Sequence, residues 1–165
     1  MSATESLLNV SNVHVAYPAR RRGGKSARAV DGVDLEIHPG EIVALVGESG
    51  CGKTTLARAI LGLQETSEGS IAFDGELLPT SASGKKAFRR RAQIVFQDPT
   101  ASLNPRHSVY EIVAEGLRIH GLVENEHQVV KNALEQCGLH PAERYMLKYP
   151  HELSGGQRQR VVIAG

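Results

Sequence analysis

One glycine-rich run, residues 47–54, constrains the fold of this chain more than any other sequence feature. It has the form G-x-x-x-x-G-K-T, in which three glycines leave backbone N–H groups free to converge on phosphate oxygens. Residues 41–46 before it, apolar from Ile42 onward, predict a buried strand, and residues 53–62 after it predict a helix. This order places the run at a helix N-terminus, where the helix dipole favours an anion. The run consists of Gly47, Glu48, Ser49, Gly50, Cys51, Gly52, Lys53 and Thr54.

The residue types within the run predict a nucleotide site. Lys53 places a positive charge at the β- and γ-phosphates, and Thr54 offers a hydroxyl ligand to Mg²⁺. A glycine-rich turn that happens to precede Lys-Thr is the alternative, and the flanking strand and helix patterns favour the nucleotide site. The run alone does not choose among kinases, small GTPases and motor-type ATPases.

The composition is that of an ordinary globular chain. Of the 165 residues, 41% are hydrophobic and 22% are charged, which suits one domain with a core. The net charge of +1 gives no electrostatic argument for a nucleic-acid partner. No apolar run approaches the roughly 20 residues that span a bilayer, and residues 1–6 lack the pattern of a signal peptide. We therefore expect a cytosolic protein that reaches a membrane only through a partner.

Cysteine and histidine do not predict a metal centre. Cys51 lies inside the glycine-rich run and Cys137 precedes Gly138, so the two form neither a metal-ligand spacing nor a disulfide framework. The seven histidines are scattered. The only metal that we expect is Mg²⁺ carried with the nucleotide.

Apolar alternation and turn residues predict further strands around the run. The basic residues within 85–91 are expected on a solvated helix face, because the total charge is close to neutral. The expected strands are residues 7–17, 29–38, 41–46, 69–75 and 93–97, with loops at residues 19–28 and 79–84.

From residue 108 to about residue 139 the apolar spacing changes to a helical period. Gly121 and Gly138 are expected at helix ends. We interpret this block as a helical subdomain inserted between strand-bearing regions. The predicted division is a β subdomain and nucleotide-binding core at residues 1–107, the helical subdomain at residues 108–152, and a final motif with its helix at residues 153–165.

That final motif is a second glycine-bearing helix start, Leu-Ser-Gly-Gly-Gln at residues 153–157. Ser154 is expected to cap a helix that begins at Gly155, and the N–H groups at that end suit phosphate. An ordinary N-capped helix is the common alternative. Each glycine inside a helix costs up to about 1 kcal/mol, so the pair Gly155 and Gly156 favours a functional reason.

Two single residues complete the set of candidates. Gln97 ends an expected strand, and its side-chain amide would reach Mg²⁺ or position an attacking water; an exposed strand-end glutamine is the alternative. Tyr17 lies beside the basic loop and would stack on adenine; ordinary packing is the alternative.

Together these residues resemble the ATP-binding subunits of ABC transporters over essentially the whole chain. Residues 47–54 match the Walker A loop, Gln97 matches the Q-loop glutamine, and residues 153–157 match the signature, which is the most family-specific motif. Tyr17 falls where the family has its adenine-stacking aromatic residue. The resemblance implies an α/β fold, a P-loop NTPase core with an N-terminal antiparallel β subdomain and an inserted α-helical subdomain.

The resemblance also implies roles and partners. In this family two ATPase subunits face each other head to tail, so that the loop of one and the signature of the other enclose each ATP. The implied cofactors are ATP and Mg²⁺, and the implied partners are a second ATPase subunit, permease subunits and, indirectly, an extracytoplasmic solute-binding protein, at the cytoplasmic face of the membrane. Gln97 would link the nucleotide to the membrane subunit, which docks against the helical block. The implied ATP-binding residues are Tyr17, Gly47, Glu48, Ser49, Gly50, Cys51, Gly52, Lys53, Thr54 and Thr55 in cis and Ser154, Gly155, Gly156 and Gln157 in trans, with Thr54 and Gln97 at Mg²⁺.

The family's Walker B carboxylates, catalytic glutamate and switch histidine have no counterpart in residues 1–165, and Glu152 is not in the catalytic position. We therefore expect a chain that is incomplete at its C-terminus, with unpaired strands, that binds ATP weakly and does not hydrolyse it.

A finer resemblance concerns the transported solute. Residues 97–106 and 29–33 resemble the oligopeptide, dipeptide and nickel importers, and the long loop at residues 17–28 resembles the second ATPase of those systems. We expect a subunit that drives import of peptides or a related small solute, nickel included. The alternatives are a nucleotide-binding module without hydrolysis and a non-transport member of the same ATPase superfamily.

Overall fold

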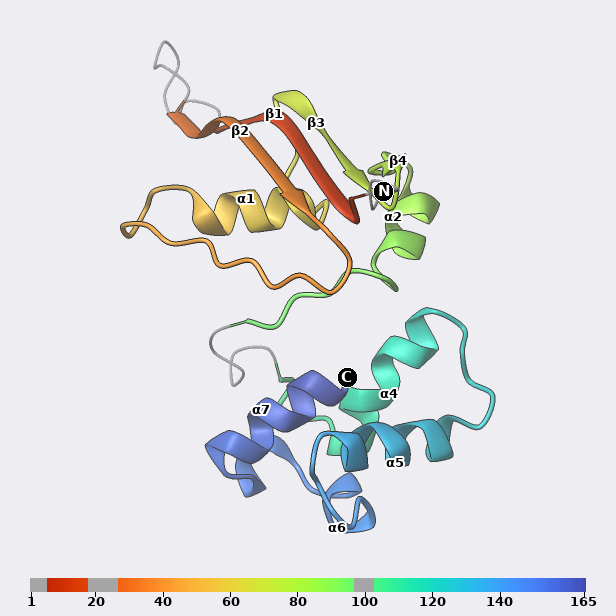
Figure 1. Ribbon diagram of the computed structural model, residues 1–165. Coiled ribbons are helices and arrows are strands. Elements are labelled where there is room, and N and C mark those ends of the chain that lie inside the picture. The colour runs from red at the N-terminus through yellow and green to blue at the C-terminus, as the bar shows by residue number, and fades with distance from the viewer. Residues whose placement is uncertain (1–5, 18–26, 97–102) are drawn as a thin grey trace. The chain divides into compact units, whose positions relative to one another are not determined.

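The computed structural model describes residues 6–17, 27–96 and 103–165. The chain divides into two compact units, Met1–Gln93 and Ile94–Gly165, and each is described here by itself. Figure 1 shows the first unit as a sheet with α1 on one face and the second as a group of helices.

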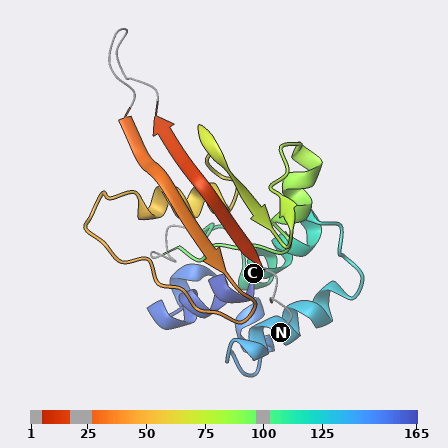
Figure 2. The ribbon, with the colours of Figure 1, turned by 45° about the horizontal axis from the view of Figure 1, so that its top comes forward.

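The first unit is built on a four-stranded antiparallel sheet in the order β2-β1-β3-β4. Apolar residues alternate along the central strand, so Val13 and Val15 are fully buried while their neighbours face outward. Figure 2 shows the two long strands side by side. The strands are β1 (Leu8–Tyr17), β2 (Ala27–Ile37), β3 (Glu68–Phe73) and β4 (Glu76–Leu77), and they confirm the strands expected at residues 7–17, 29–38 and 69–75.

Two helices belong to this unit. Helix α1 (Lys53–Ile60) buries Leu56 and Ala59 against the sheet's apolar face. Helix α2 (Ala82–Phe88) begins inside the segment that was expected to be a loop, because the Ser81 hydroxyl accepts a hydrogen bond from the N–H of Gly84 at 3.1 Å and caps it.

The expected strands at residues 41–46 and 93–97 are wrong within the part of the chain that the structure describes. Residues 41–46 and 93–96 form no strand, and Ile42 and Val46 are 97% and 93% exposed. An apolar run becomes a strand only when a neighbouring strand pairs with its N–H and C=O groups. Among the described residues, the only paired strands are β1, β2, β3 and β4, so neither segment has such a neighbour.

The second unit is helical, as the change of apolar spacing predicts. Gly121 and Gly138 end its two longest early helices with φ of 69° and 76°, which confirms both expected helix ends. Side chains from several helices pack into one hydrophobic core, in which Val109, Val130, Leu134 and Val161 are fully buried. The elements are α4 (Val109–Ile119), α5 (Glu126–Gln136), α6 (Glu143–Met146), the 3₁₀ turn η1 (Pro150–Glu152) and α7 (Gly155–Ala164).

The core of the helical unit gives a stability prediction. Replacing Leu134, which is fully buried, by alanine should lower the unfolding free energy of this unit by about 2–5 kcal/mol, because transfer energy is lost and a cavity remains. Leu147, which is 83% exposed, provides the matched control, and its alanine variant should change stability by less than about 0.5 kcal/mol. Amide hydrogen exchange in α5, measured at increasing urea concentrations, gives the unfolding free energy of the helical unit in both variants. Equal effects of the two variants would contradict the packing described.

Glu126 joins α5 to α4 through three hydrogen bonds. The Arg118 guanidinium donates to both carboxylate oxygens at 2.9 and 2.7 Å, and the Tyr110 hydroxyl donates to one of them at 2.8 Å. The hydrogen bond from Arg118, followed by that from Tyr110, holds the pKa of the Glu126 carboxyl below its usual range.

This arrangement predicts a pH dependence for the helical unit. A carboxyl whose pKa is lowered by folding contributes stability that is fully present above its unfolded pKa of 4.5 and is lost as the pH falls through the lower, folded value. The melting temperature of the helical unit should therefore fall on acidification below that pH, and Glu126→Gln should reduce the fall. Glu124→Gln, at an exposed position two residues before the start of α5, is the control. An identical acid dependence in both variants would show that this contact does not contribute.

Candidate functional site

The glycine-rich run leads directly into α1. Gly52 is the N-cap residue, with φ of 95°, and Lys53 is the first helical residue. The early N–H groups of a helix have no partner within the helix, and the dipole is positive there, so the start of α1 offers the phosphate-binding geometry that the sequence predicts.

Lys53 folds back over the run. Its ammonium donates hydrogen bonds to the carbonyl oxygens of Gly47 at 2.7 Å and Glu48 at 2.6 Å, and it lies 3.4 Å from Sγ of Cys51. The charge is therefore held within the loop that would surround a phosphate, and the carbonyls keep it there without a ligand. Thr54 is exposed on the first turn of α1, and Thr55 beside it is half-buried.

The packing around Gly52 leaves no room for a side chain at this position. A Cβ added to it would lie 2.1 Å from the carbonyl oxygen of Ala29 on β2, so the run packs directly on the backbone of that strand. Gly50 also has a positive φ, 84°, but a Cβ there would meet nothing within 4 Å. Ala29 is a site residue that sequence reasoning missed, because a backbone contact between distant segments leaves no pattern in the linear sequence.

Tyr17 lies at the end of β1, opposite Ala27 of β2 in the ladder, and is 38% exposed. Ala27 is two residues from Ala29, about 7 Å along a strand. Because Gly52 packs on Ala29, the structure brings Tyr17 to the end of the sheet where α1 begins. Gln97 lies outside the described residues.

The second motif forms the N-terminus of α7 in the helical unit. Ser154 is the N-cap residue: its hydroxyl accepts from the N–H of Gln157 at 3.3 Å, and the Gln157 side chain accepts from the N–H of Ser154 at 2.9 Å. This reciprocal capping box confirms the helix start expected at Gly155. Val161, fully buried, anchors the helix in the core, while Ser154 and the two glycines are exposed.

Among the residues that the structure describes, none requires glycine at the two positions in α7. A Cβ added to Gly155 or Gly156 would meet no atom within 4 Å, and neither residue has a positive φ. Glycine in a helix nevertheless costs up to about 1 kcal/mol relative to alanine. Contacts among the described residues therefore give no reason for glycine at this open helix end.

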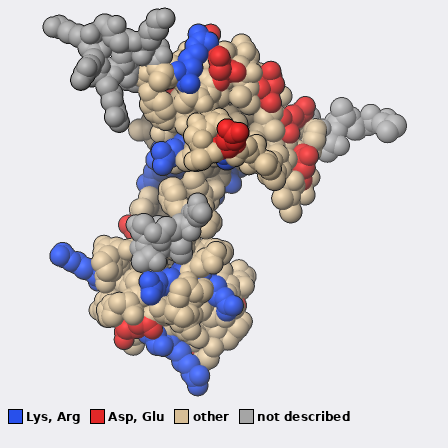
Figure 3. Space-filling model, turned by 90° about the vertical axis from the view of Figure 1, so that its left-hand side faces the viewer, with Lys and Arg blue, Asp and Glu red and all other residues tan. Residues whose placement is uncertain are grey.

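The described residues contain no group of three histidine, cysteine, aspartate or glutamate side chains placed to hold a metal ion. On the face seen in Figure 3, both acidic and basic side chains lie on the surface of the sheet unit. Across the described residues, no helix is long and apolar enough to cross a bilayer.

A glycine-rich loop at the start of a helix beside an antiparallel sheet, with a capped Ser-Gly-Gly helix in a separate helical unit, defines a nucleotide-binding class of protein. The profile of the ABC transporter family matches residues 30–165, and the chain belongs to this family.

Curated relatives match nearly the whole chain. It is 47% identical over 163 residues to the putative oligopeptide transport ATP-binding protein YkfD of Bacillus subtilis, covering 96% of this chain and 48% of that protein. It is 45% identical to the oligopeptide transport ATP-binding protein OppF of Bacillus subtilis, covering 98% of this chain and 53% of the relative. The glutathione import ATP-binding protein GsiA of Escherichia coli O157:H7 is 44% identical, over 97% of this chain and 26% of GsiA. The chain thus spans about half the length of the first two relatives.

Solved structures agree on the fold. CbiO1 from Clostridium perfringens, described as part of the ABC transporter complex CbiONQ, superimposes with a TM-score of 0.76 at 32% identity, over 96% of this chain and 60% of CbiO1. The dimeric ATP-binding cassette MJ0796 bound to ADP and Pi has a TM-score of 0.75 at 30% identity, over 95% of this chain and 67% of that chain. The expected α/β fold of an ABC ATPase, incomplete relative to the full cassette, is confirmed.

Proposed function

We propose that this chain is the nucleotide-binding part of an ABC ATPase subunit that drives import of peptides or a related small solute. The observation that carries the proposal is the Lys53 ammonium held over the glycine-rich run by the carbonyls of Gly47 and Glu48 at the start of α1. The names of the relatives YkfD, OppF and GsiA supply the solute class, since oligopeptides and glutathione are all peptides.

In this proposal the sheet unit binds ATP in cis. Lys53 moves from the loop carbonyls to the β- and γ-phosphates, and the N–H groups at the start of α1 hold the remaining phosphate oxygens. Thr54 and Gln97 hold Mg²⁺, which when bound neutralises charge on the phosphates, and Thr55 contacts phosphate. Tyr17 stacks on adenine, which its exposure and its place at the same end of the sheet support.

The start of α7 binds the ATP held by a second ATPase subunit. Residues 154–157 form a capped helix end that is open to approach, because Gly155 and Gly156 have no side chains to block it. A phosphate that arrives across an interface needs this geometry, because backbone N–H groups must reach it directly. Closure of the two subunits on ATP then makes ATP the ligand that favours the closed dimer. The residues proposed to act in trans are Ser154, Gly155, Gly156 and Gln157.

The substitution Gly156→Ala distinguishes a role of this helix end in binding the partner's ATP from a role in the folding of α7. The alanine should leave the fold intact and stabilise α7 by up to about 1 kcal/mol, because helix propensity rises and no clash arises. ATP-dependent association of the complete ATPase subunit should nevertheless weaken at least tenfold, because the methyl group lies between the helix end and the partner's phosphate. Thermal melting measures the first effect and sedimentation with ATP measures the second.

The control for this experiment is Gln159→Ala, an exposed position further along α7 that lies outside the motif. It should change neither melting nor association. Undiminished association of the Gly156→Ala variant, together with its normal melting, would exclude the role of this helix end.

The partners follow from this arrangement. We propose a second ATPase subunit, permease subunits that dock against the helical unit, and a solute-binding protein that acts through the permease, with the ATPase at the cytoplasmic face of the membrane. The solved cassette MJ0796 is dimeric, and CbiO1 is described as part of a transporter complex; both support this assembly.

A further inference from the structure

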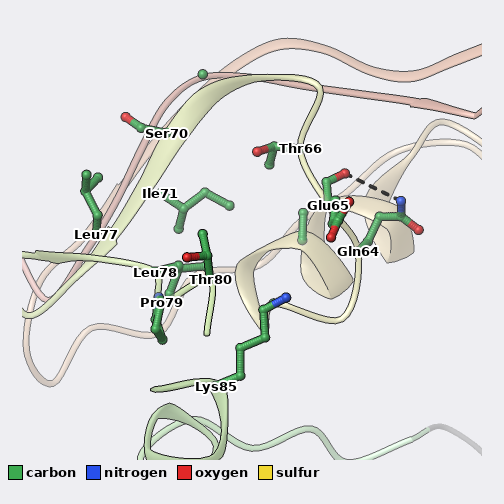
Figure 4. A pocket seen from close by; sticks show the side chains of 13 residues that line it. Gln64, Glu65, Thr66, Ser70, Ile71, Leu77, Leu78, Pro79, Thr80 and Lys85 are labelled. Atoms are coloured by element: carbon green, nitrogen blue, oxygen red, sulfur yellow. Dashed lines mark hydrogen bonds between the residues drawn. The ribbon is translucent and has the colours of Figure 1, made fainter. Parts of the chain in front are cut away.

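The sheet unit contains a cavity that the nucleotide site does not use. It has a volume of about 370 Å³, within the range of small-molecule sites, and lies between the end of α1, strand β3 and the segment that leads into α2. None of the residues of the glycine-rich run lines it. Figure 4 shows its lining from close by.

One side of the cavity is apolar. Ala59 of α1 and Ile71 of β3 are 1% and 5% exposed, and Leu78 and Pro79 continue this surface toward α2. An aliphatic group placed here would leave water and gain about 25 cal/mol for each Å² of apolar surface that it buries.

The other side carries two opposite charges without partners. Lys85 of α2 and Glu65, which follows α1, both line the cavity. Among the residues that the structure describes, neither side chain makes a hydrogen bond or an ion pair, and no ion pair joins the two. Figure 4 shows the Lys85 side chain reaching toward the Gln64 and Glu65 side of the cavity.

Two hydroxyl groups add to the polar lining, Thr66 beside Glu65 and Thr80 beside Leu78 and Pro79 (Figure 4). Thr66 and Thr80 line the cavity, and neither hydroxyl makes a hydrogen bond within the described part of the chain. A few converging polar groups beside an apolar surface are the usual composition of a ligand site.

The pairing of charges restricts the ligand. A simple anion would satisfy Lys85 but approach the Glu65 carboxylate, and a simple cation would do the reverse. An α-amino acid carries an ammonium and a carboxylate on one carbon, so a single small headgroup offers a partner of opposite charge to each of the two side chains, while its own side chain can turn to the apolar lining. We propose that this cavity is a binding site for a zwitterionic α-amino acid with an aliphatic side chain, separate from the nucleotide site.

A ligand series on the unchanged chain tests the proposal. L-leucine, titrated up to about 10 mM into the isotope-labelled protein, should shift the amide resonances of Thr66, Ile71 and Lys85. N-acetyl-L-leucine lacks the ammonium and L-leucinamide lacks the carboxylate. Each should bind at least about tenfold more weakly, because one charge-assisted hydrogen bond is lost. Glycine, which lacks the aliphatic group, should also bind more weakly.

Two substitutions assign the contacts. Lys85→Gln and Glu65→Gln should each weaken L-leucine binding about tenfold, whereas Lys86→Gln, which changes an exposed lysine outside the cavity, should not. Thermal melting checks that each variant is folded. The ligand series uses the unchanged chain, so it tests the proposal even if a variant does not fold. Absence of shifts with L-leucine, equal binding of N-acetyl-L-leucine, or stronger shifts at Lys85 with inorganic phosphate would each overturn the proposal.

Discussion

Lys53→Ala is expected to abolish the stabilisation of this protein by ATP and Mg²⁺. A ligand present at 100 times its Kd stabilises the folded state by about 2.7 kcal/mol, and this increment should disappear in the variant. The physical reason is that the Lys53 ammonium is the positive side-chain charge held inside the glycine-rich loop, by the carbonyls of Gly47 and Glu48. Without it, the glycine-rich run has no cationic side chain to offer the phosphates.

The measurement is the melting temperature with and without ATP and Mg²⁺. Lys86→Ala is the matched control, because it removes an exposed lysine of α2 and should leave the ATP-dependent shift unchanged. The apo melting temperature of the Lys53→Ala variant should stay close to that of the parent, since the ammonium bonds only with its own loop. A full ATP-dependent shift in this variant would refute the assignment of the nucleotide site to this loop.

Gly52→Ala should be the most destabilising single-methyl change at the site. Its Cβ would lie 2.1 Å from the backbone carbonyl oxygen of Ala29, and its φ of 95° is one that alanine rarely adopts. The backbone conformation alone costs about 1–2 kcal/mol, and displacement of the strand backbone brings the expected loss to about 4 kcal/mol or more. Amide exchange in β1 and β2 under native conditions measures the loss within the sheet unit.

Gly50→Ala isolates the clash from the conformational cost. Gly50 also has a positive φ, 84°, but its Cβ would be in open space. Its alanine variant should therefore lose only about 1–2 kcal/mol. Similar losses in the two variants would show that the contact of Gly52 with β2 does not hold the loop in place.

Local patterns predicted much of the fold correctly. The alternation around Val13 and Val15 identified β1, and Ser154 as the expected N-cap residue identified the start of α7. These features depend on residues within a few positions of one another, which is the range over which side-chain direction and capping operate.

The sequence failed where an element depends on a distant partner. Ile42 and Val46 are as apolar as the residues of β1, yet the structure leaves them 97% and 93% exposed. Their composition describes the face that a neighbouring strand and helix would cover, and it carries no information about whether that neighbour is present. The same reasoning applies to Val95 and Phe96, which are 54% and 47% exposed.

The sequence by itself determined the family and predicted the nucleotide site, because residues 47–54 and 153–157 are contiguous motifs of defined residue types at fixed spacing. Only the tertiary structure decided that Gly52 rests on the backbone of Ala29 and that, in the part of the chain that the structure describes, no side chain crowds Gly155 and Gly156. It alone also brought Lys85 and Glu65, from different elements, to one cavity. These contacts and open spaces depend on segments that are far apart in the sequence, so no local pattern of residues encodes them.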